Sequence, residues 1–256
     1  MINLDKANKA FDNYVANYDI SIEKINLKIK HSKRVQKIAR NLAISLKLEK
    51  EEQNLSELIG LLHDIGRFEQ IKIYDSFVDS KTIDHADLGV KILFEDGIIR
   101  NFIEDKQYDR IIYKAIKNHN KYSIEEGLYD IELLQSKIIK DADKIDILDI
   151  VTKRDLKHYY KKRDIGDQEM SDIIYENIKE HKLINNNDKK TDIDKWISTI
   201  SLIFDVNFKE SLKIIKNNNV INKMIDRVEY TNIDTELKIE DIKKIANKYL
   251  DLKLTE

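Results

Sequence analysis

Apolar residues recur at three- and four-residue intervals along most of the chain, which is the pattern of helices that bury one face. Clear stripes run through 22–46, 55–62 and 108–117, and the stretch 133–151 is apolar on more than one face, as a central buried helix should be. Proline is absent and only six glycines occur, so the two residues that interrupt helices are nearly missing. The pattern predicts an all-α fold.

Three histidines belong to these helical patterns. His31 takes an inward position in the stripe of 22–46, and His119 extends the stripe that ends at Lys117. His85 begins a helix, where the positive helix end keeps an imidazole neutral and able to bind a cation. Each has a structural alternative: a core histidine bonded to a carbonyl, a cation that compensates the helix dipole, or a first-turn side chain in water.

The segment Leu61–Arg67 sets an imidazole and a carboxylate side by side at the end of an apolar helix. Gly66 is expected to end that helix, which puts His63 and Asp64 in its last turn. Neighbours on a regular helix point about 100° apart, but a helix that unwinds toward a glycine can turn both side chains onto one ion. The alternative is a histidine under a helix end with a capping aspartate.

The helix 133–151 carries acids among its apolar residues. Asp143 and Asp146 share one stripe, and Asp141 lies on another. A carboxylate on a buried face destabilises the fold unless it is paired or bound to a cation. Because the chain has no cysteine, histidine and carboxylates are the available metal ligands. A bound metal would satisfy both observations.

The order of these residues resembles a known family. His31, the pair His63-Asp64 and an aspartate within 140–146 resemble the H...HD...D signature of the HD-domain metal-dependent phosphohydrolases. The resemblance covers residues 20 to 155 and implies an HD-domain helical bundle. Apolar stripes in the remaining residues, such as Trp196, Ile200, Ile203 and Phe204, predict additional C-terminal helices.

The resemblance also implies a ligand set. The family's last metal ligand maps to Asp143, whereas periodicity leaves Asp141 as the alternative. His85 and His119 look like the two extra histidines of the dinuclear branch, which contains cyclic-dinucleotide phosphodiesterases. By resemblance, Asp64 bridges two ions, and the other ligands are His31, His63 and Asp143 for the first ion and His85 and His119 for the second. Mixed imidazole and carboxylate ligation favours iron or manganese, with one or two ions bound.

Three further residues are candidates for substrate contacts. Arg67 resembles the lysine of the HDIGK element in phosphodiesterase-type members, and it is either a phosphate clamp or a cation at a helix C-terminus. Asn120 follows His119 and is placed to reach the pocket. Lys144 contacts a substrate phosphate or neutralises Asp141. The expected catalytic residues are therefore Asp64, Arg67 and Lys144, and the expected substrate contacts are Arg67, Asn120 and Lys144. No GYP-type motif follows, so the resemblance does not extend to cyclic-dinucleotide specificity.

The polar run 181–190 is the best candidate for a loop between parts of the chain. We expect an HD-type core in 1–180 and a C-terminal helical appendage in 181–256 that packs on it. The N-terminus has no apolar leader, and no stretch approaches the roughly 20 apolar residues of a membrane span. The sequence therefore predicts a cytoplasmic protein with no membrane partner.

Charge disfavours nucleic acid as a partner. With 45 basic and 47 acidic residues the net charge is -2, so no global field draws the protein to a polyanion. The basic, tyrosine-containing run 153–163 suggests RNA contact, but a solvated helix end explains it better. The expected partner is a small phosphorylated substrate, with a nucleotide preferred.

The predicted activity is hydrolysis of a phosphomonoester or phosphodiester of a nucleotide or related metabolite by metal-activated water. The alternative is a non-catalytic nucleotide-sensing or scaffold protein with a structural metal site. Retention of all six ligand candidates favours the enzyme.

Overall fold

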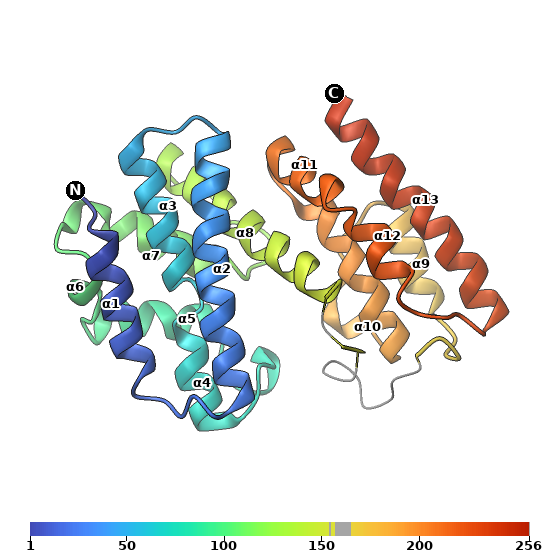
Figure 1. Cartoon of the computed structure of the whole chain (residues 1–256), viewed down its shortest axis with the longest axis horizontal. Helices are drawn as coiled ribbons and strands as arrows, with labels where there is room; N and C mark the ends of the chain where they lie inside the picture. Colours follow the sequence, from blue (N-terminus) through green and yellow to red (C-terminus); the bar gives the residue numbers. More distant parts are fainter. Residues whose placement is uncertain (154, 157–164, 256) are drawn as a thin grey trace. The chain divides into compact units, whose positions relative to one another are not determined.

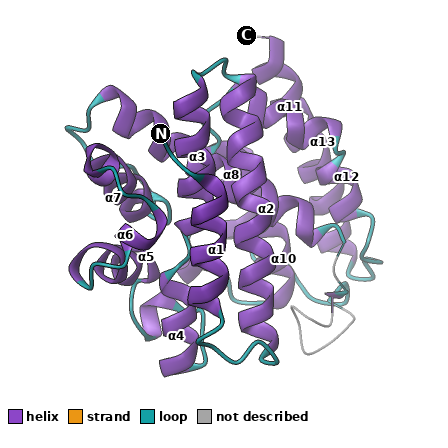
Figure 2. Cartoon of the chain, turned by 60° about the vertical axis from the view of Figure 1, so that its left-hand side comes forward, coloured by secondary structure: helices purple, strands orange, loops and turns teal. Residues whose placement is uncertain are grey.

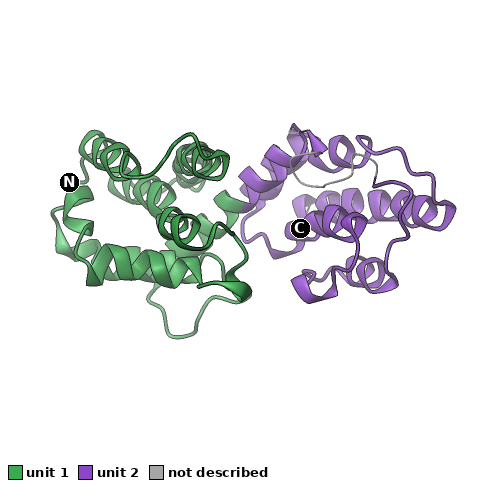
Figure 3. Ribbon diagram, turned by 90° about the horizontal axis from the view of Figure 1, so that it is seen from below, with its two compact units in different colours: residues 1–143 green, residues 144–256 purple. Residues whose placement is uncertain are grey.

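The computed structural model describes residues 1–153, 155–156 and 165–255, and every regular element in this part of the chain is a helix (Figure 2). The all-α prediction is confirmed. Residue 154 and residues 157–163 of the basic, tyrosine-containing run lie outside the described residues. The chain divides into two compact units, residues 1–143 and 144–256 (Figure 3). No helix in the described ranges is long and apolar enough to cross a membrane.

Unit 1 holds the helices that carry the candidate ligands (Figure 1). In chain order they are α1 (Leu4–Val15), α2 (Glu23–Ser45), α3 (Lys50–Leu62), α4 (Gly66–Tyr74), α5 (His85–Val90), α6 (Ile99–Phe102) and α7 (Asp109–Asn118). Shorter turns separate some of them: η1 (Asp79–Lys81), the π-helical turn η2 (Lys91–Glu95) and η3 (Lys106–Tyr108). The long helix α8 (Asp130–Val151) begins in unit 1 and ends in unit 2.

Unit 2 has a core of its own, in which Trp196 is 1% exposed. Its helices are α9 (Asp172–Lys179), α10 (Asp192–Ser198), α11 (Lys209–Asn217), α12 (Val220–Ile225) and α13 (Ile233–Thr255), with the 3-10 segments η5 (Asn186–Asp188) and η6 (Thr199–Asp205). The polar run 181–190, which suggested a boundary after residue 180, lies inside this unit.

The helices α2 and α3 pack side by side at very close range because a glycine lies between them. A Cβ atom on Gly60 would lie 2.9 Å from both the carbonyl oxygen of Val35 and the Cα atom of Gln36. Only a residue without a side chain allows this approach. The close packing brings the inward face of α2, which carries His31, against the end of α3, which carries His63.

Gly66 begins a helix rather than ending one, which corrects the sequence interpretation. The helix α3 ends at Leu62 with His63 as its C-cap, and α4 starts at Gly66. A Cβ atom on Gly66 would lie 2.3 Å from the carbonyl oxygen of His85 and 2.6 Å from the amide nitrogen of Gly89. Gly66 is therefore required by the approach of α5, and this approach carries His85 toward Asp64.

The first part of α8 is anchored in unit 1 by buried polar contacts. Ser56 on α3 donates a hydrogen bond to the Oε1 atom of Gln135 at 2.8 Å. The ammonium group of Lys140 donates to the carbonyl oxygen of Lys121 at 2.5 Å. These contacts fix the turn of α8 that precedes Asp143.

Candidate metal centre

Four histidines from four different places in the fold surround the carboxylate of Asp64. Each of these five side chains is at least nine-tenths buried. His31 lies within α2, His63 at the C-cap of α3, His85 at the first position of α5 and His119 at the C-cap of α7. The structure thus brings together, within unit 1, residues that are up to 88 positions apart in the sequence, from His31 to His119.

The Oδ2 atom of Asp64 faces the first pair of histidines. It lies 3.3 Å from the Nε2 atom of His31 and 3.5 Å from that of His63. The Oδ1 atom of Asp143 lies 3.1 Å from the Nε2 atom of His31 and 3.8 Å from that of His63. Asp143, which the resemblance implied as the last ligand of the first ion, therefore lies beside both histidines of the first pair. Asp141 is fully buried on the same helix.

The Oδ1 atom of Asp64 faces the second pair. It lies 3.3 Å from the Nε2 atom of His85 and 3.8 Å from that of His119. The two triads, His31-His63-Asp64 and Asp64-His85-His119, each place their ligand atoms within 4.8 Å of one another. They share Asp64, so one carboxylate lies between two groups of donors.

The hydrogen-bond partners of the Nδ1 atoms, the outer ring nitrogens that point away from Asp64, show which tautomers are present. The Nδ1 atom of His63 lies 2.8 Å from the carbonyl oxygen of Gly60, and that of His119 lies 2.6 Å from the carbonyl oxygen of Ile116. A carbonyl oxygen only accepts, so both Nδ1 atoms carry the proton. The Nδ1 atom of His85 lies 2.6 Å from the carboxylate of Asp79 and is protonated for the same reason. In the neutral rings, the Nε2 atoms then present lone pairs to Asp64.

The electrostatics of the centre favour neutral imidazoles beside ionised carboxylates. Burial lowers the pKa of His63 and lowers the pKa of His85 to about 4. Burial alone would raise the pKa of Asp64, but the positive charge of Lys28 holds it well below its ordinary value. Burial would likewise raise the pKa of Asp143, and its hydrogen bond with His31 lowers it. These are the protonation states in which the groups bind a cation.

The donor set fits divalent metal ions. The Nε2 atoms of His85 and His119 lie 3.0 Å apart although neither carries a proton in the neutral rings, so their lone pairs repel each other. A cation that both atoms coordinate removes this repulsion. Imidazole nitrogens with carboxylate oxygens and no thiolate suit first-row ions such as iron and manganese.

Lys28 is a polar neighbour of the centre that the sequence pattern did not single out. Its ammonium nitrogen lies 2.5 Å from the Oδ2 atom of Asp64 and 5.5 Å from the ring centroid of Phe77. The lysine side chain is 21% exposed, so it joins the buried carboxylate to the surface of unit 1. Its place one turn before His31 was the only signal in the sequence, and six other lysine and arginine residues on the same helix made it impossible to single out.

Arg67 lies beside the centre, in the first turn of α4 and not at a helix C-terminus. Its Nη1 atom donates to the carboxylate of Asp79 at 2.7 Å, to the carbonyl oxygen of Phe77 at 2.8 Å and to Gln70 at 2.7 Å. Its Nε atom lies 3.6 Å from the Oδ1 atom of Asp64 and is buried without a hydrogen-bond partner. One edge of the guanidinium is thus anchored, and the Nε atom faces the carboxylate at the centre.

The other two expected substrate contacts have protein partners. Asn120 donates through Nδ2 to Asp84 at 3.0 Å, and its Oδ1 atom is buried without a hydrogen-bond partner. Lys144 lies in unit 2, where its ammonium nitrogen is 2.6 Å from the Oδ2 atom of Asp205 and 2.5 Å from the carbonyl oxygen of the same residue. These two contacts differ from both roles that the sequence suggested for Lys144.

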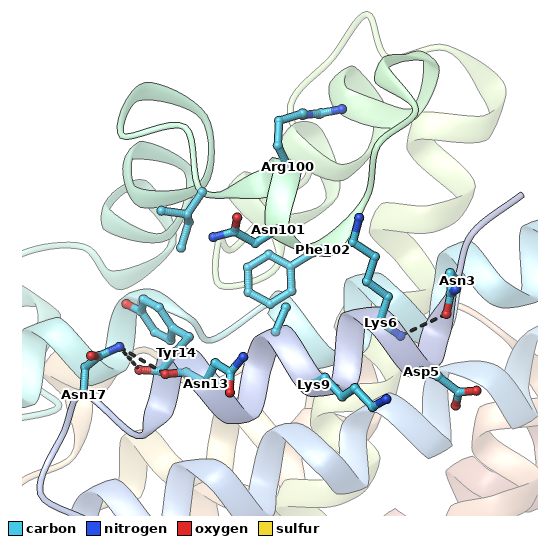
Figure 4. Close-up of a pocket in the computed structure, with 12 residues that line it drawn as sticks. Asn3, Asp5, Lys6, Lys9, Asn13, Tyr14, Asn17, Arg100, Asn101 and Phe102 are labelled. Atoms are coloured by element: carbon cyan, nitrogen blue, oxygen red, sulfur yellow. Dashed lines mark hydrogen bonds between the residues drawn. The ribbon is translucent and has the colours of Figure 1, made fainter.

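An open groove of about 870 Å³ lies between α1 and α6, as Figure 4 shows. Its lining includes Lys6, Lys9 and Tyr14 of α1 and, on the other side, Arg100 and Phe102 of α6. None of the predicted site residues lines this groove, and its lining contains no histidine. It does not offer a set of metal ligands comparable with that around Asp64.

A family model described as HD domain matches residues 29–148, a stretch that contains all six candidate ligands. No curated protein and no solved structure matches the chain.

Proposed function

Residues 29–148 of this chain belong to the HD domain family, and on that premise we propose that the protein is a metal-dependent phosphohydrolase. We further propose that it acts in the cytoplasm on a phosphomonoester or phosphodiester of a nucleotide or related metabolite. The observation that carries the proposal is the pair of donor triads that share Asp64, in which His63, His85 and His119 already have the tautomer that binds metal through Nε2. Iron or manganese is the preferred metal.

In this proposal the protein side chains have separate tasks. Asp64 bridges the two subsites with its two oxygens, His31, His63 and Asp143 complete the first, and His85 and His119 complete the second. When bound there, divalent ions would polarise a phosphoryl oxygen and lower the pKa of an attacking water. The dense shell of buried side chains keeps the ligands in place before substrate arrives.

We assign phosphate binding to the cations beside the centre. Lys28 is partly exposed and already neighbours Asp64, so its ammonium group is placed to pair with a phosphate oxygen. The Nε atom of Arg67 is a buried donor without a hydrogen-bond partner, which supports its predicted contact with phosphate. The Oδ1 atom of Asn120 is a buried acceptor without a partner, so it would accept from a hydroxyl or amino group of the substrate and not bind the phosphate. The predicted role of Lys144 requires that its ammonium leave Asp205, so we rank it below Lys28.

The test combines metal analysis with a substrate screen. Purified protein is expected to contain iron or manganese, or to take them up from Fe(II) or Mn(II) under anaerobic conditions, and Asp64→Ala is expected to lose the metal. His85→Ala and His119→Ala should each lose about one equivalent. The wild type should hydrolyse at least one member of a panel of p-nitrophenyl phosphate, bis-p-nitrophenyl phosphate and nucleotides.

The variants also separate binding of substrate from binding of metal. Lys28→Met should raise KM with unchanged metal content, whereas Lys24→Met, one turn earlier on α2 and paired with exposed Asp75, should leave both unchanged. Protein that stays metal-free after anaerobic incubation would refute the metal site. Bound metal without turnover of any ester would instead favour the sensing or scaffold alternative.

A further inference from the structure

Asp79 contacts the outer ring nitrogen of His85, and this contact differs in kind from those made by the outer nitrogens of His63 and His119. It lies at the start of η1, in the segment between α4 and α5, and its Oδ2 atom is 2.6 Å from the Nδ1 atom of His85. The Nδ1 atoms of His63 and His119 are instead bonded to neutral backbone carbonyls of their own helices. Of these three rings, His85 is therefore the one whose outer nitrogen is held by a charged side chain from another segment.

The carboxylate of Asp79 is itself held on several sides. Its Oδ1 atom accepts hydrogen bonds from Arg67 at 2.7 Å and from Gln70 at 2.9 Å. Asn120 donates to its Oδ2 atom at 3.4 Å. With both oxygens engaged, Asp79 has little freedom to rotate, so the ring that it contacts is fixed as well.

The segment around Asp79 is fastened to α4 by the same residues. Gln70 donates to the hydroxyl of Thr82 at 2.8 Å and to the carbonyl oxygen of Ile83 at 2.9 Å, and Arg67 donates to the carbonyl oxygen of Phe77. The position of Asp79 is therefore set by α4, whose first residue, Gly66, lies against α5. One connected set of contacts runs from α4 through Asp79 to His85.

We propose that Asp79 is a positioning residue that sets the metal affinity of the second subsite through His85. The proposal rests on the proposed function, because it assumes that His85 is a metal ligand. A carboxylate that accepts the Nδ1 proton fixes the ring orientation, keeps Nε2 unprotonated and makes it a stronger donor. The first subsite, formed by His31, His63 and Asp143, has no contact with Asp79 among the hydrogen bonds described above.

The experiment is a titration of metal-free protein with Mn(II), in which isothermal calorimetry measures the affinity of each ion. The wild type should bind two ions. Asp79→Asn and Asp79→Ala should bind the second ion about 10- to 100-fold more weakly, with unchanged affinity for the first. The matched control is Asp75→Asn, in the same segment, because Asp75 pairs with Lys24 at the surface and does not touch the centre.

A second readout needs neither metal nor activity. Nitrogen-15 spectra of the metal-free protein should show His85 as the Nδ1-protonated tautomer in the wild type and as a mixture in Asp79→Ala. Asp79→Asn keeps an acceptor oxygen without the charge, so it should retain the tautomer and still lose affinity. Circular dichroism shows whether each variant folds. If Asp79→Ala does not fold, the metal affinities of Asp79→Asn decide the question.

The outcomes separate the two proposals. Two ions bound with wild-type affinities by both Asp79 variants would overturn the role of Asp79 and leave the phosphohydrolase intact. Equal weakening of both ions would also overturn it, because a general structural role would then explain the effect. A wild type that binds no Mn(II) would refute the metal centre itself.

Discussion

At the scale of single residues, Asp64 concentrates the chemistry because its two oxygens face different pairs of histidines. Lys28 and Arg67 supply two positive charges beside three ionised carboxylates, those of Asp64, Asp79 and Asp143. Buried negative charge that exceeds the positive charge nearby destabilises a fold unless cations bind. The charge balance of these residues thus argues for bound metal independently of the tautomers.

Asp194 in unit 2 provides a test of buried charge away from the metal centre. Its fully buried carboxylate accepts hydrogen bonds from the backbone and hydroxyl of Ser171 and from the amides of Lys190 and Thr191. Burial alone would raise the pKa of Asp194, but these donors lower it below the ordinary 3.8. The folded state therefore binds the proton less readily than the unfolded state does. The resulting stability is complete above the ordinary pKa and is lost as the pH falls through the folded pKa.

We expect Asp194→Asn to lower the free energy of unfolding of unit 2 at pH 7 by on the order of 3 kcal/mol, because its amide group faces donors that need an acceptor. The difference between variant and wild type should shrink below pH 3.8. Urea unfolding monitored by Trp196 fluorescence measures both. Asp192→Asn is the control, since Asp192 lies on the same helix and pairs with Lys195 at the surface. Equal stability of Asp194→Asn and wild type at pH 7 would contradict the argument.

The sequence pattern marked the candidate histidines one by one, the choice of Asp143 over Asp141 came from the family resemblance, and the neighbours of these residues carried no signal that singled them out. His31 interrupts an apolar stripe, and His63 and His119 stand at helix ends, so each was marked by its position in a regular pattern. Lys28 lies on a polar face with many cations, where no pattern separates one from another. Asp79 lies in a segment without periodicity, so its contact with His85 depends on a chain path that the sequence pattern does not give.

At the scale of elements, two close approaches of backbone build the centre. Gly60 lets α3 approach α2, and Gly66 lets α5 approach the start of α4. The sequence predicted the long helices well: the stretch 22–46 is α2, with bounds Glu23–Ser45. It could not predict the new helix at Gly66, because glycine usually ends helices and the reason for it here is the backbone of α5.

Substitution by alanine should affect the free energy of unfolding differently at two glycines that pack against each other. Gly66→Ala places a methyl group in the space of backbone atoms of α5, so we expect a loss of about 1–3 kcal/mol in the free energy of unfolding. A Cβ atom on Gly89 has its nearest neighbour at 3.5 Å, and Gly89 lies inside α5. Gly89→Ala should therefore be neutral or stabilise by about 0.5–1 kcal/mol.

Urea unfolding of both variants, measured by circular dichroism, checks this pair. Gly66→Ala should also bind Mn(II) more weakly, because α5 carries His85 and must move to admit the methyl group. Gly89→Ala should keep the wild-type metal affinity. If both substitutions destabilise the protein to a similar degree, α4 and α5 tolerate no added methyl group at either position, and the close approach at Gly66 is not the specific cause.

At the scale of the whole molecule, the metal centre and the single tryptophan belong to different compact units. All six candidate ligands lie in residues 1–143, and Trp196 lies in the core of residues 144–256. The sequence placed a boundary after residue 180 because the polar run 181–190 looks like a linker. A compact unit is defined by contacts between helices that are distant in the sequence. The polarity of a short segment does not show which helices make such contacts.

The division into units predicts how metal affects thermal unfolding. Ions that bind only the folded state of unit 1 stabilise it by about 2.7 kcal/mol each at 100 times Kd. Each kcal/mol raises Tm by roughly 3–4 °C for a unit of this size, so Mn(II) should raise the unit 1 transition relative to EDTA by about 10 °C for one bound ion and about 20 °C for two. The fluorescence transition of Trp196 should keep the same midpoint in both conditions, because no candidate ligand lies in unit 2. Far-UV circular dichroism, which reports both units, should then show two transitions in Mn(II) that differ from those in EDTA only for unit 1.

Asp64→Ala serves as the control for this measurement, since it should abolish the response to Mn(II) while it leaves the Trp196 transition unchanged. If the Trp196 midpoint instead rises together with the unit 1 transition, the two units unfold as one cooperative structure, and α8, which belongs to both, is the element that couples them. If neither transition responds to Mn(II) in the wild type, the histidines around Asp64 do not hold a metal ion in solution.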